Sequence, residues 1–432
     1  MSHRPVLTAI VEKAKSISYA LCSWKLKALA VICLQLIATG PIKAQQPISN
    51  DQLLSTKDIG DIFNQLFKKK PDTSTAAEPS ASILPSLGYN PSYGFVFGGK
   101  ASLVKQYGQA GTTDLSAFGL EAIYATKGIT SVQARHSVFT AENKWVLQGN
   151  WQLSKFVIDD YGIGTGNRNA ITNGDSSYPL TFQFIRLTET FYRRIGKHLF
   201  AGGGISFDMR AAIEDERFDS VGTSPHYRYS VRNGFDPKKY FSNGLIAAML
   251  FNSREHPIRP YRGTYTEVSF RFNPTWLGSS RSSVQFICDL RKYFSLSDKN
   301  PEHVLAFWHT ASYRVSGAVP YLEMPATAYD TYGRSGRAYT MGRFKGPSYA
   351  YFEAEWRFPI LRNKFISGVL FANSQTAGND IGKSVYDTWE PAAGAGLRVL
   401  FNKGSRSTIC IDYARGKYNS GGLFFFGLNE VF

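Results

Sequence analysis

Long hydrophobic runs and cysteines are both scarce in this sequence. After the first fifty residues no stretch holds 18 consecutive apolar side chains, so no transmembrane helix is expected there. Only four cysteines occur in 432 residues, and Cys288 and Cys410 are the two beyond residue 44. Their spacing does not indicate a disulfide, and the sequence has no Cys-x-x-Cys pair and no Cys/His cluster. We therefore predict no metal site and no cofactor.

Charged residues are also few, at 19% of the chain, and basic ones dominate, with a formal net charge of +16. Apart from residues 68–70, the basic side chains are scattered among aromatic ones and do not form runs, so nucleic-acid binding is not expected. We assign these charges to loops and to a polar interior, with some facing the anionic headgroups of membrane lipids.

Aromatic residues and glycines are abundant, with 31 Phe, 24 Tyr and 39 Gly. This composition is typical of many strands joined by turns. From Ser82 onward, apolar and polar side chains alternate with a period of two, as in residues 266–272, 350–358 and 409–413. In residues 145–153 the apolar face carries Trp145, Leu147, Trp151 and Leu153, and the polar face carries Gln148, Asn150 and Gln152.

Such alternation fits a soluble sandwich or a membrane barrel, which turns its apolar side chains outward to lipid and its polar side chains into the lumen. The ~350 residues after Ser82, at roughly 22 for each strand and its connection, give about 16 strands, and even numbers are the rule in bacterial barrels. The sequence therefore predicts an all-β fold, a transmembrane antiparallel β-barrel over residues 82–432.

Residues 1–44 have the features of an export signal. Basic residues precede an apolar run at 28–38, and Ile42-Lys43-Ala44 is an imperfect Ala-x-Ala cleavage site. The run, about 11 residues long, is short for a membrane span. We therefore expect a cleaved signal peptide and a location in the outer membrane of a Gram-negative bacterium. The alternative is an uncleaved membrane anchor.

Residues 45–81 differ in pattern from the rest and are expected to be periplasmic. A short amphipathic helix is predicted, followed by Lys68-Lys69-Lys70-Pro71 and a linker at 72–81 rich in Ser, Thr, Ala and Pro. The helix could pack on the barrel mouth, dock on the membrane surface, plug the barrel or bind a partner. Its apolar face would consist of Ile59, Ile62, Phe63, Leu66 and Phe67.

The final ten residues, 423–432, are rich in Phe and stop on Phe432. In bacterial barrels, a last strand that stops on an aromatic residue is the signal read by the assembly machinery, and this strand closes the barrel against the first one. We therefore assign Phe426, Gly427 and Phe432 to a closing-strand signal.

Four segments, in their order and spacing, resemble the bacterial surface-antigen barrels of the BamA/TamA-type superfamily. Residues 252–263 are similar to the family's D-x-R-x-x-P-x-x-P-x-x-G turn, with Asn252 in place of the Asp. The other three segments are 83–98, 337–360 and the closing region 394–432. Large members carry periplasmic POTRA-type domains of about 75 residues. Residues 45–81 are too few for one, so we expect a short member that lacks them.

The resemblance also implies a loop that folds into the lumen. In the family an Arg-Gly-aromatic tip enters the barrel, and its Arg meets carboxylates of the wall, which suit the forked guanidinium donor. Here Arg337 matches that Arg, Tyr339 matches the aromatic residue, and Ala338 replaces the Gly, where a positive φ would be costly. Arg343 and Gly346 complete the motif. The expected wall residues are Glu353, Glu355, Arg357 and Asp289.

The first expected function is assistance in the insertion or translocation of proteins, or of lipids, at the outer membrane. Partners would be outer-membrane lipids, unfolded outer-membrane or secreted proteins, and a separate periplasmic protein. A weakly paired seam between the first and last strands could open and template an incoming strand. Gly98-Gly99 and Gly421-Gly422 would weaken that pairing, although turns and bulges explain these glycines equally well.

Two other functions stay open at this point. One is a passive or gated pore, with Arg135, Arg186, Arg271 and Arg357 favouring anions. The other is a structural barrel that carries a partner on its N-terminal helix. An enzyme is not expected, because the histidines beyond residue 44 fall in no nucleophile elbow or metal motif.

Overall fold

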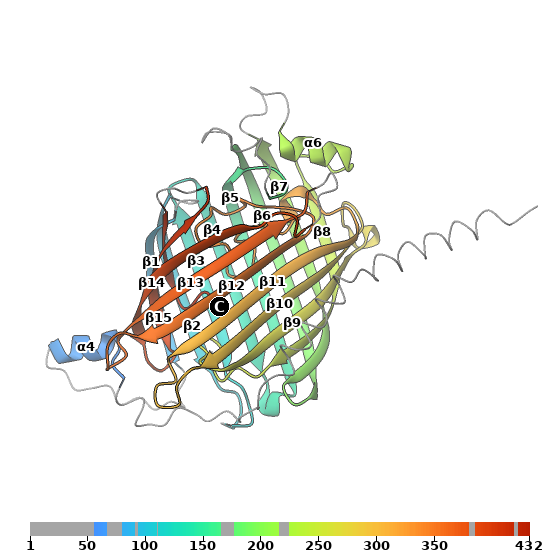
Figure 1. The fold of residues 1–432 in the computed structure, drawn as a ribbon. Coiled ribbons are helices and arrows are strands. Elements are labelled where there is room, and N and C mark those ends of the chain that lie inside the picture. The colour runs from blue at the N-terminus through green and yellow to red at the C-terminus, as the bar shows by residue number, and fades with distance from the viewer. Residues whose placement is uncertain are drawn as a thin grey trace, which may run out of the picture. The chain divides into compact units, whose positions relative to one another are not determined.

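The computed structural model describes residues 56–66, 80–90, 94–109, 111–165, 177–215, 224–379, 385–418 and 422–432. The predicted signal peptide and most of the predicted linker lie outside these ranges. Within them, sixteen antiparallel strands form one sheet in sequence order, each strand paired with the next (Figure 1). The predicted all-β barrel of about sixteen strands is confirmed.

The strands begin at Ser80, two residues before the predicted barrel boundary. The first eight are β1 (Ser80–Asn90), β2 (Gly94–Lys105), β3 (Ser116–Ala125), β4 (Ile129–Phe139), β5 (Trp145–Asp160), β6 (Tyr178–Gly196), β7 (Leu199–Asp215) and β8 (Tyr240–Asn252). The others are β9 (Gly263–Asn273), β10 (Ser283–Ser295), β11 (Val304–Gly317), β12 (Tyr349–Pro359), β13 (Ile366–Ala377), β14 (Glu390–Asn402), β15 (Ser407–Gly416) and β16 (Leu423–Leu428).

The alternation of side chains along the strands explains why this sheet closes around a polar interior. On β5, Trp151 and Leu153 are 47% and 55% exposed on the outer surface, whereas Gln152 lines an internal cavity. On β12, Phe352 and Trp356 are exposed, whereas the alternating residues Tyr351, Glu353, Glu355 and Arg357 are buried. Apolar side chains therefore face outward and polar ones inward, as a lipid-facing barrel requires.

The described helices are short. They are α4 (Ile59–Leu66), α6 (Pro225–Arg232) and the 3-10 turns η1 (Ala141–Asn143), η3 (Thr275–Leu277) and η4 (Tyr321–Glu323). In Figure 1, α4 and α6 lie at opposite ends of the strands. None of the helices in the described ranges has the length and apolar character needed to cross a membrane.

The predicted N-terminal helix is α4, and it ends at Leu66; Phe67, from its predicted apolar face, lies outside the described residues. Its polar side holds it to the barrel. Nζ of Lys403, in the turn between β14 and β15, lies 2.8 Å from Oδ2 of Asp61. The main-chain N–H of Lys403 also donates to Asp58 over 3.0 Å. Of the alternatives for this helix, packing at the barrel end is the arrangement observed.

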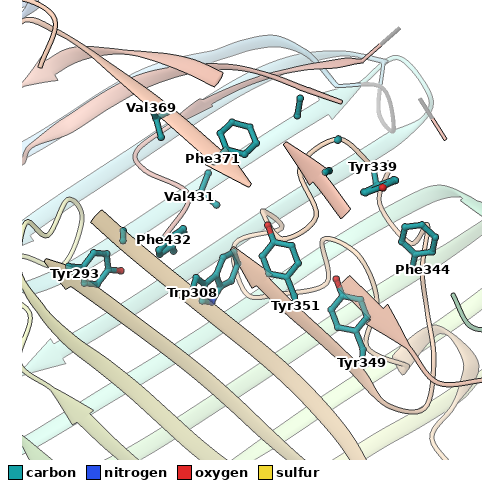
Figure 2. Packing of buried hydrophobic residues seen from close by; sticks show 14 of the residues in the cluster. Tyr293, Trp308, Tyr339, Phe344, Tyr349, Tyr351, Val369, Phe371, Val431 and Phe432 are labelled. Atoms are coloured by element: carbon teal, nitrogen blue, oxygen red, sulfur yellow. The ribbon is translucent and has the colours of Figure 1, made fainter. Parts of the chain in front are cut away.

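The connection between β11 and β12, residues 318–348, folds into the barrel, and we call it the inward loop. Its aromatic residues meet the wall in a buried cluster, in which Tyr339 and Phe344 lie near Tyr349, Tyr351 and Phe371 (Figure 2). A second cluster packs η4 of the inward loop against β5 to β8 and α6. The interior core therefore forms between the loop and the wall.

Candidate functional site

Sharp turns allow the inward loop to reverse inside the barrel. Gly333, Gly336 and Gly342 all have positive φ, and an isolated bridge pairs Ala326 with Lys345 across the base of the loop. At Gly346 a β carbon would lie 2.2 Å from the carbonyl oxygen of Gly378. Only glycine therefore lets the end of the loop approach the neighbouring chain so closely.

Arg337 is the centre of the loop tip, and its side chain is 3% exposed. Its Nη2 lies 2.5 Å from Oε1 of Glu353 on β12, and its Nη1 lies 2.9 Å from Oδ2 of Asp412 on β15. It also forms an ion pair with Glu355 of β12. The guanidinium carbon stacks 3.4 Å from the ring centroid of Phe371. One guanidinium thus joins two separate strands of the wall through the loop.

The three carboxylates have further partners, so the cluster is not acidic overall. Nε of Arg357 donates to Glu355 over 2.7 Å, and Nη1 of Arg398 lies 2.5 Å from Oδ1 of Asp412. Burial alone would lower the pKa of Arg337, but the surrounding carboxylates hold this pKa well above its ordinary value. The cluster is therefore a network of charged pairs in which every carboxylate has a cation.

The structure corrects one predicted partner and supplies another. Glu353 and Glu355 contact Arg337 as the sequence predicted, and Arg357 belongs to the same network. Asp289 does not contact Arg337; it accepts from Arg291 of its own strand over 2.8 Å. Asp412 takes its place. The alternation Ile411-Asp412-Tyr413, which turns Asp412 inward, was the sequence signal for it.

Ala338 adopts the backbone that the family's glycine would favour. Its φ is +89° and its side chain is fully buried, so this position carries the strain of a left-handed conformation at a residue with a β carbon. The next residue, Tyr339, donates its hydroxyl to the carbonyl of Pro391 over 2.7 Å. Ala338 therefore takes the positive φ that we expected to be costly at this position.

Arg343 serves the loop through aromatic contacts. Its guanidinium carbon lies 4.3 Å from the ring centroid of Tyr161 and 4.9 Å from that of Tyr418. Because Tyr161 follows β5 and Tyr418 follows β15, this side chain also bridges two parts of the wall.

A second anchor, which sequence reasoning missed, fixes the first part of the loop. Glu323 of η4 lies 3.4 Å from Nη2 of Arg186 and forms an ion pair with Arg210. Behind them, Asp208 lies 2.6 Å from Nε of Arg186 and 2.7 Å from Nη2 of Arg271. These partners lie on β6, β7 and β9, far from Arg337's partners on β12 and β15, so the loop is held from both sides.

A third anchor fixes the end of the loop. Nζ of Lys345 lies 2.8 Å from Oδ1 of Asp160 at the end of β5, and both side chains are fully buried. The hydroxyl of Tyr321 donates to the other carboxylate oxygen of Asp160 over 2.8 Å. No spacing rule in the sequence connects residues 160 and 345, which explains why this pair was not predicted.

His226 of α6 covers this third anchor, with its ring 5.4 Å from that of Tyr321. Burial lowers the pKa of His226 to about 4; Asp160 opposes this effect, and Lys345 adds to it. A histidine in an unfolded chain has a pKa near 6.5. The free energy of unfolding is therefore unaffected by this group above about pH 6.5, and it decreases as the pH falls towards 4, because the unfolded chain takes up the proton first. We expect a loss of about 3 kcal/mol across this window from this group.

The measurement is the unfolding midpoint, together with protease cleavage near α6, at pH 7.5 and pH 4.5. His226→Gln, which cannot take up the proton, is the matched variant and should show a smaller difference between the two pH values. An equal difference in both proteins would contradict this account.

The arginines that the pore hypothesis placed in the lumen are engaged in contacts. Arg186 and Arg271 pair with Asp208, Arg357 pairs with Glu355, and Arg135 lies 3.3 Å from Glu121. A cavity of about 820 Å³ remains between the inward loop and the wall, and it reaches residues of β1, β2, β15 and β16. Paired arginines attract anions less strongly than isolated ones, so this geometry does not favour the anion pore.

The two ends of the sheet meet at a seam between β1 and β16. In the described residues no backbone ladder joins these strands, and β16 has six residues where β1 has eleven. The hydroxyl oxygen of Ser82 on β1 lies 3.2 Å from that of Ser405 in the β14–β15 turn. This hydrogen bond ties β1 to the β14–β15 turn, beyond β16, and β1 and β16 themselves lie next to each other.

Of the predicted closing-strand residues, Phe426 and Gly427 lie on β16, where Phe426 pairs with Ile411 and is 50% exposed on the outer face. Phe432 does not lie on the strand. β16 ends at Leu428, Asn429 takes a φ of +69°, and Phe432 is buried in the interior. The expectation that the strand runs to Phe432 is wrong. The reason is that aromatic side chains and buried arginines inside the barrel contact these last residues.

A sixteen-stranded antiparallel sheet with a lipid-facing exterior and an ion-paired loop inside its lumen defines a class of membrane barrel. The Omp85 superfamily domain matches residues 97–432. The chain therefore belongs to the Omp85 superfamily, and it is an outer-membrane β-barrel. This membership confirms the resemblance to BamA/TamA-type barrels drawn from the sequence.

The fold is shared with a solved barrel structure, that of BamA. BamA from Haemophilus ducreyi lacking POTRA domains 1-3 is similar with a TM-score of 0.51 and 14% identity, over 82% of this chain and 70% of that chain. CdiB from Escherichia coli is similar with a TM-score of 0.49 and 8% identity, over 84% of this chain and 63% of that chain. No curated protein matches this chain.

Proposed function

We propose that this barrel assists the insertion or translocation of proteins at the outer membrane through its seam. The observation that carries the proposal is the missing backbone ladder between β1 and β16 in the described residues. Unpaired edge groups can template an incoming strand by β-augmentation. Membership of the Omp85 superfamily supports the proposal, since the fold is shared with BamA.

The inward loop supports the same proposal from inside the lumen. Three separate ionic anchors, at Glu323, Arg337 and Lys345, hold the loop against the wall. Such a loop obstructs a free aqueous path along the barrel axis, so a role at the wall is favoured over conduction through the lumen. Unfolded outer-membrane or secreted chains are the proposed clients, and a separate periplasmic protein would deliver them.

The test compares client insertion by the same protein with and without a disulfide that holds the seam shut. Ser82→Cys with Ser405→Cys places two thiols where hydroxyl oxygens now lie 3.2 Å apart, in a chain with Cys288 and Cys410 replaced by Ala. Oxidation should form a disulfide across the seam. We expect the oxidised barrel in liposomes to insert an unfolded barrel client at close to the rate of protein-free liposomes, and reduction to restore insertion.

Equal insertion by the oxidised and reduced forms would contradict a role for the seam. Insertion no faster than in protein-free liposomes, combined with steady ion conductance, would overturn the proposal for this barrel and favour the pore. The wild-type chain under oxidising conditions is the control for effects of the oxidant on the client.

A further inference from the structure

The short segment after β16, residues 429–432, turns into the lumen and is buried there. Glu430, Val431 and Phe432 are each less than a tenth exposed. The turn is made at Asn429, whose positive φ suits an asparagine. The segment is attached directly to the strand that forms one side of the seam. Whatever holds it inside therefore also holds β16.

Arg334 of the inward loop binds the main chain at this point. Its Nη2 donates to the carbonyl of Leu428 over 2.6 Å, and its Nη1 donates to the carbonyls of Asn429 and Glu430. Three consecutive carbonyl groups that β-pairing would otherwise satisfy are thus taken by one guanidinium of the loop.

Glu430 is the charged centre of the segment. Its Oε2 lies 2.7 Å from Nε of Arg398 on β14, and its Oε1 lies 3.1 Å from Nε of Arg259. All three residues are at most 3% exposed. A carboxylate without partners could not stay in such a place, and neither could two adjacent guanidiniums without the carboxylate.

Arg259 reaches this position because the turn between β8 and β9 extends across to β13 and β14. Its Nη2 donates to the hydroxyl of Ser367 at the start of β13 over 2.7 Å. Arg406, in the β14–β15 turn, lies 3.1 Å from Glu255 and donates to the carbonyl of Arg259. The turn that resembles the family motif is thus a brace between β8–β9 and the side of the sheet that ends at the seam.

Phe432 adds an apolar contact to the ionic one. Its ring centroid lies 5.3 Å from that of Trp308 and 6.1 Å from that of Tyr293, and the three side chains are adjacent in Figure 2. The main-chain oxygen of Phe432 accepts from Nη2 of Arg357 over 2.9 Å. The segment is therefore fixed at both its acidic and its aromatic residue.

We infer that Glu430, held between Arg259 and Arg398, is a clasp that keeps β16 in place at the seam, and that release of this clasp permits the seam to open. The clasp acts on β16, one of the two end strands of the sheet, and no backbone ladder joins it to β1 in the described residues. These are positioning residues, and their role in client insertion rests on the function proposed above.

The experiment measures opening of the seam without any client. The chain carries Ser82→Cys and Ser405→Cys, with Cys22, Cys33, Cys288 and Cys410 replaced by Ala, and is kept reduced in liposomes while a membrane-impermeant thiol reagent labels the engineered cysteines. Glu430→Gln removes the carboxylate charge but keeps its shape. We expect labelling at least about tenfold faster than in the parent, because two buried guanidiniums lose their partner. Glu430→Asp should recover much of the parent rate.

Glu323→Gln is the matched control, because Glu323 is equally enclosed by two arginines but lies on the inward loop, where its partners belong to β6 and β7 and not to the strands at the seam. It should leave the labelling rate near that of the parent, and the folded band on unheated gels should remain in every variant. Parent-like labelling in Glu430→Gln, or equal acceleration in Glu323→Gln, would overturn the clasp. If Glu430→Gln prevents folding, Arg259→Lys is measured instead, with a smaller increase expected.

Because no client is present, this outcome is independent of the insertion test. Fast labelling of Glu430→Gln together with a failed insertion test would keep the clasp and reject the proposed function. If Glu430→Gln is labelled at the parent rate, while insertion succeeds in the reduced barrel and stops in the oxidised one, the proposed function is kept and the clasp is rejected.

Discussion

Replacement of Arg337 by Ala should lower the free energy of unfolding by about 3–5 kcal/mol and release the tip of the inward loop. The reason is that Glu353, Glu355 and Asp412, all at most 3% exposed, would lose the guanidinium that joins them. Urea unfolding in lipid vesicles measures the stability. Protease cleavage within residues 318–348 measures the release of the loop.

Two variants separate the ionic contacts of Arg337 from general packing. Arg337→Lys keeps a charge but cannot serve the three carboxylates with a planar fork, so it should fall between Ala and the parent. Arg343→Ala removes an arginine of the same loop that stacks on Tyr161 and Tyr418, and should cost only about 1 kcal/mol. A loss in Arg337→Ala no greater than in Arg343→Ala would refute the central role of Arg337.

The second large effect is expected at the fully buried pair of Lys345 and Asp160. Lys345→Met should destabilise the barrel by about 3–5 kcal/mol, because the Asp160 carboxylate would stay buried without its cation. The double variant Lys345→Met with Asp160→Asn should recover most of this loss, since the charge is gone and the Asn oxygen still accepts from Tyr321.

Unfolding of the parent, both single variants and the double variant forms a complete cycle. Losses that simply add in the double variant would mean that the two charges do not depend on one another, contrary to the geometry. The denaturant concentration at which protease cleaves half of the inward loop should rank the four proteins in the same order as the unfolding midpoint, because this pair fixes the end of the loop.

The sequence by itself determined the architecture. Alternation with a period of two places one side chain on lipid and the next in the lumen, so residues such as Trp151, Phe352 and Glu353 already specify the two faces of the wall. Chain length gave the number of strands. The contact of Arg337 with Glu353 and Glu355 could also be predicted, because both carboxylates lie on the polar face of the strand that follows the loop.

Tertiary structure alone decided which distant side chains meet inside the barrel. Alternation says that Asp289 and Asp412 both face inward, but closure of the sheet decides that Asp412 is the one beside Arg337. The pairs Lys345–Asp160 and Arg259–Glu430 join residues 185 and 171 positions apart, and no local pattern encodes such contacts. Burial of a charge requires a partner wherever the fold brings one, so the partners are fixed by how the sheet closes and where the loop enters.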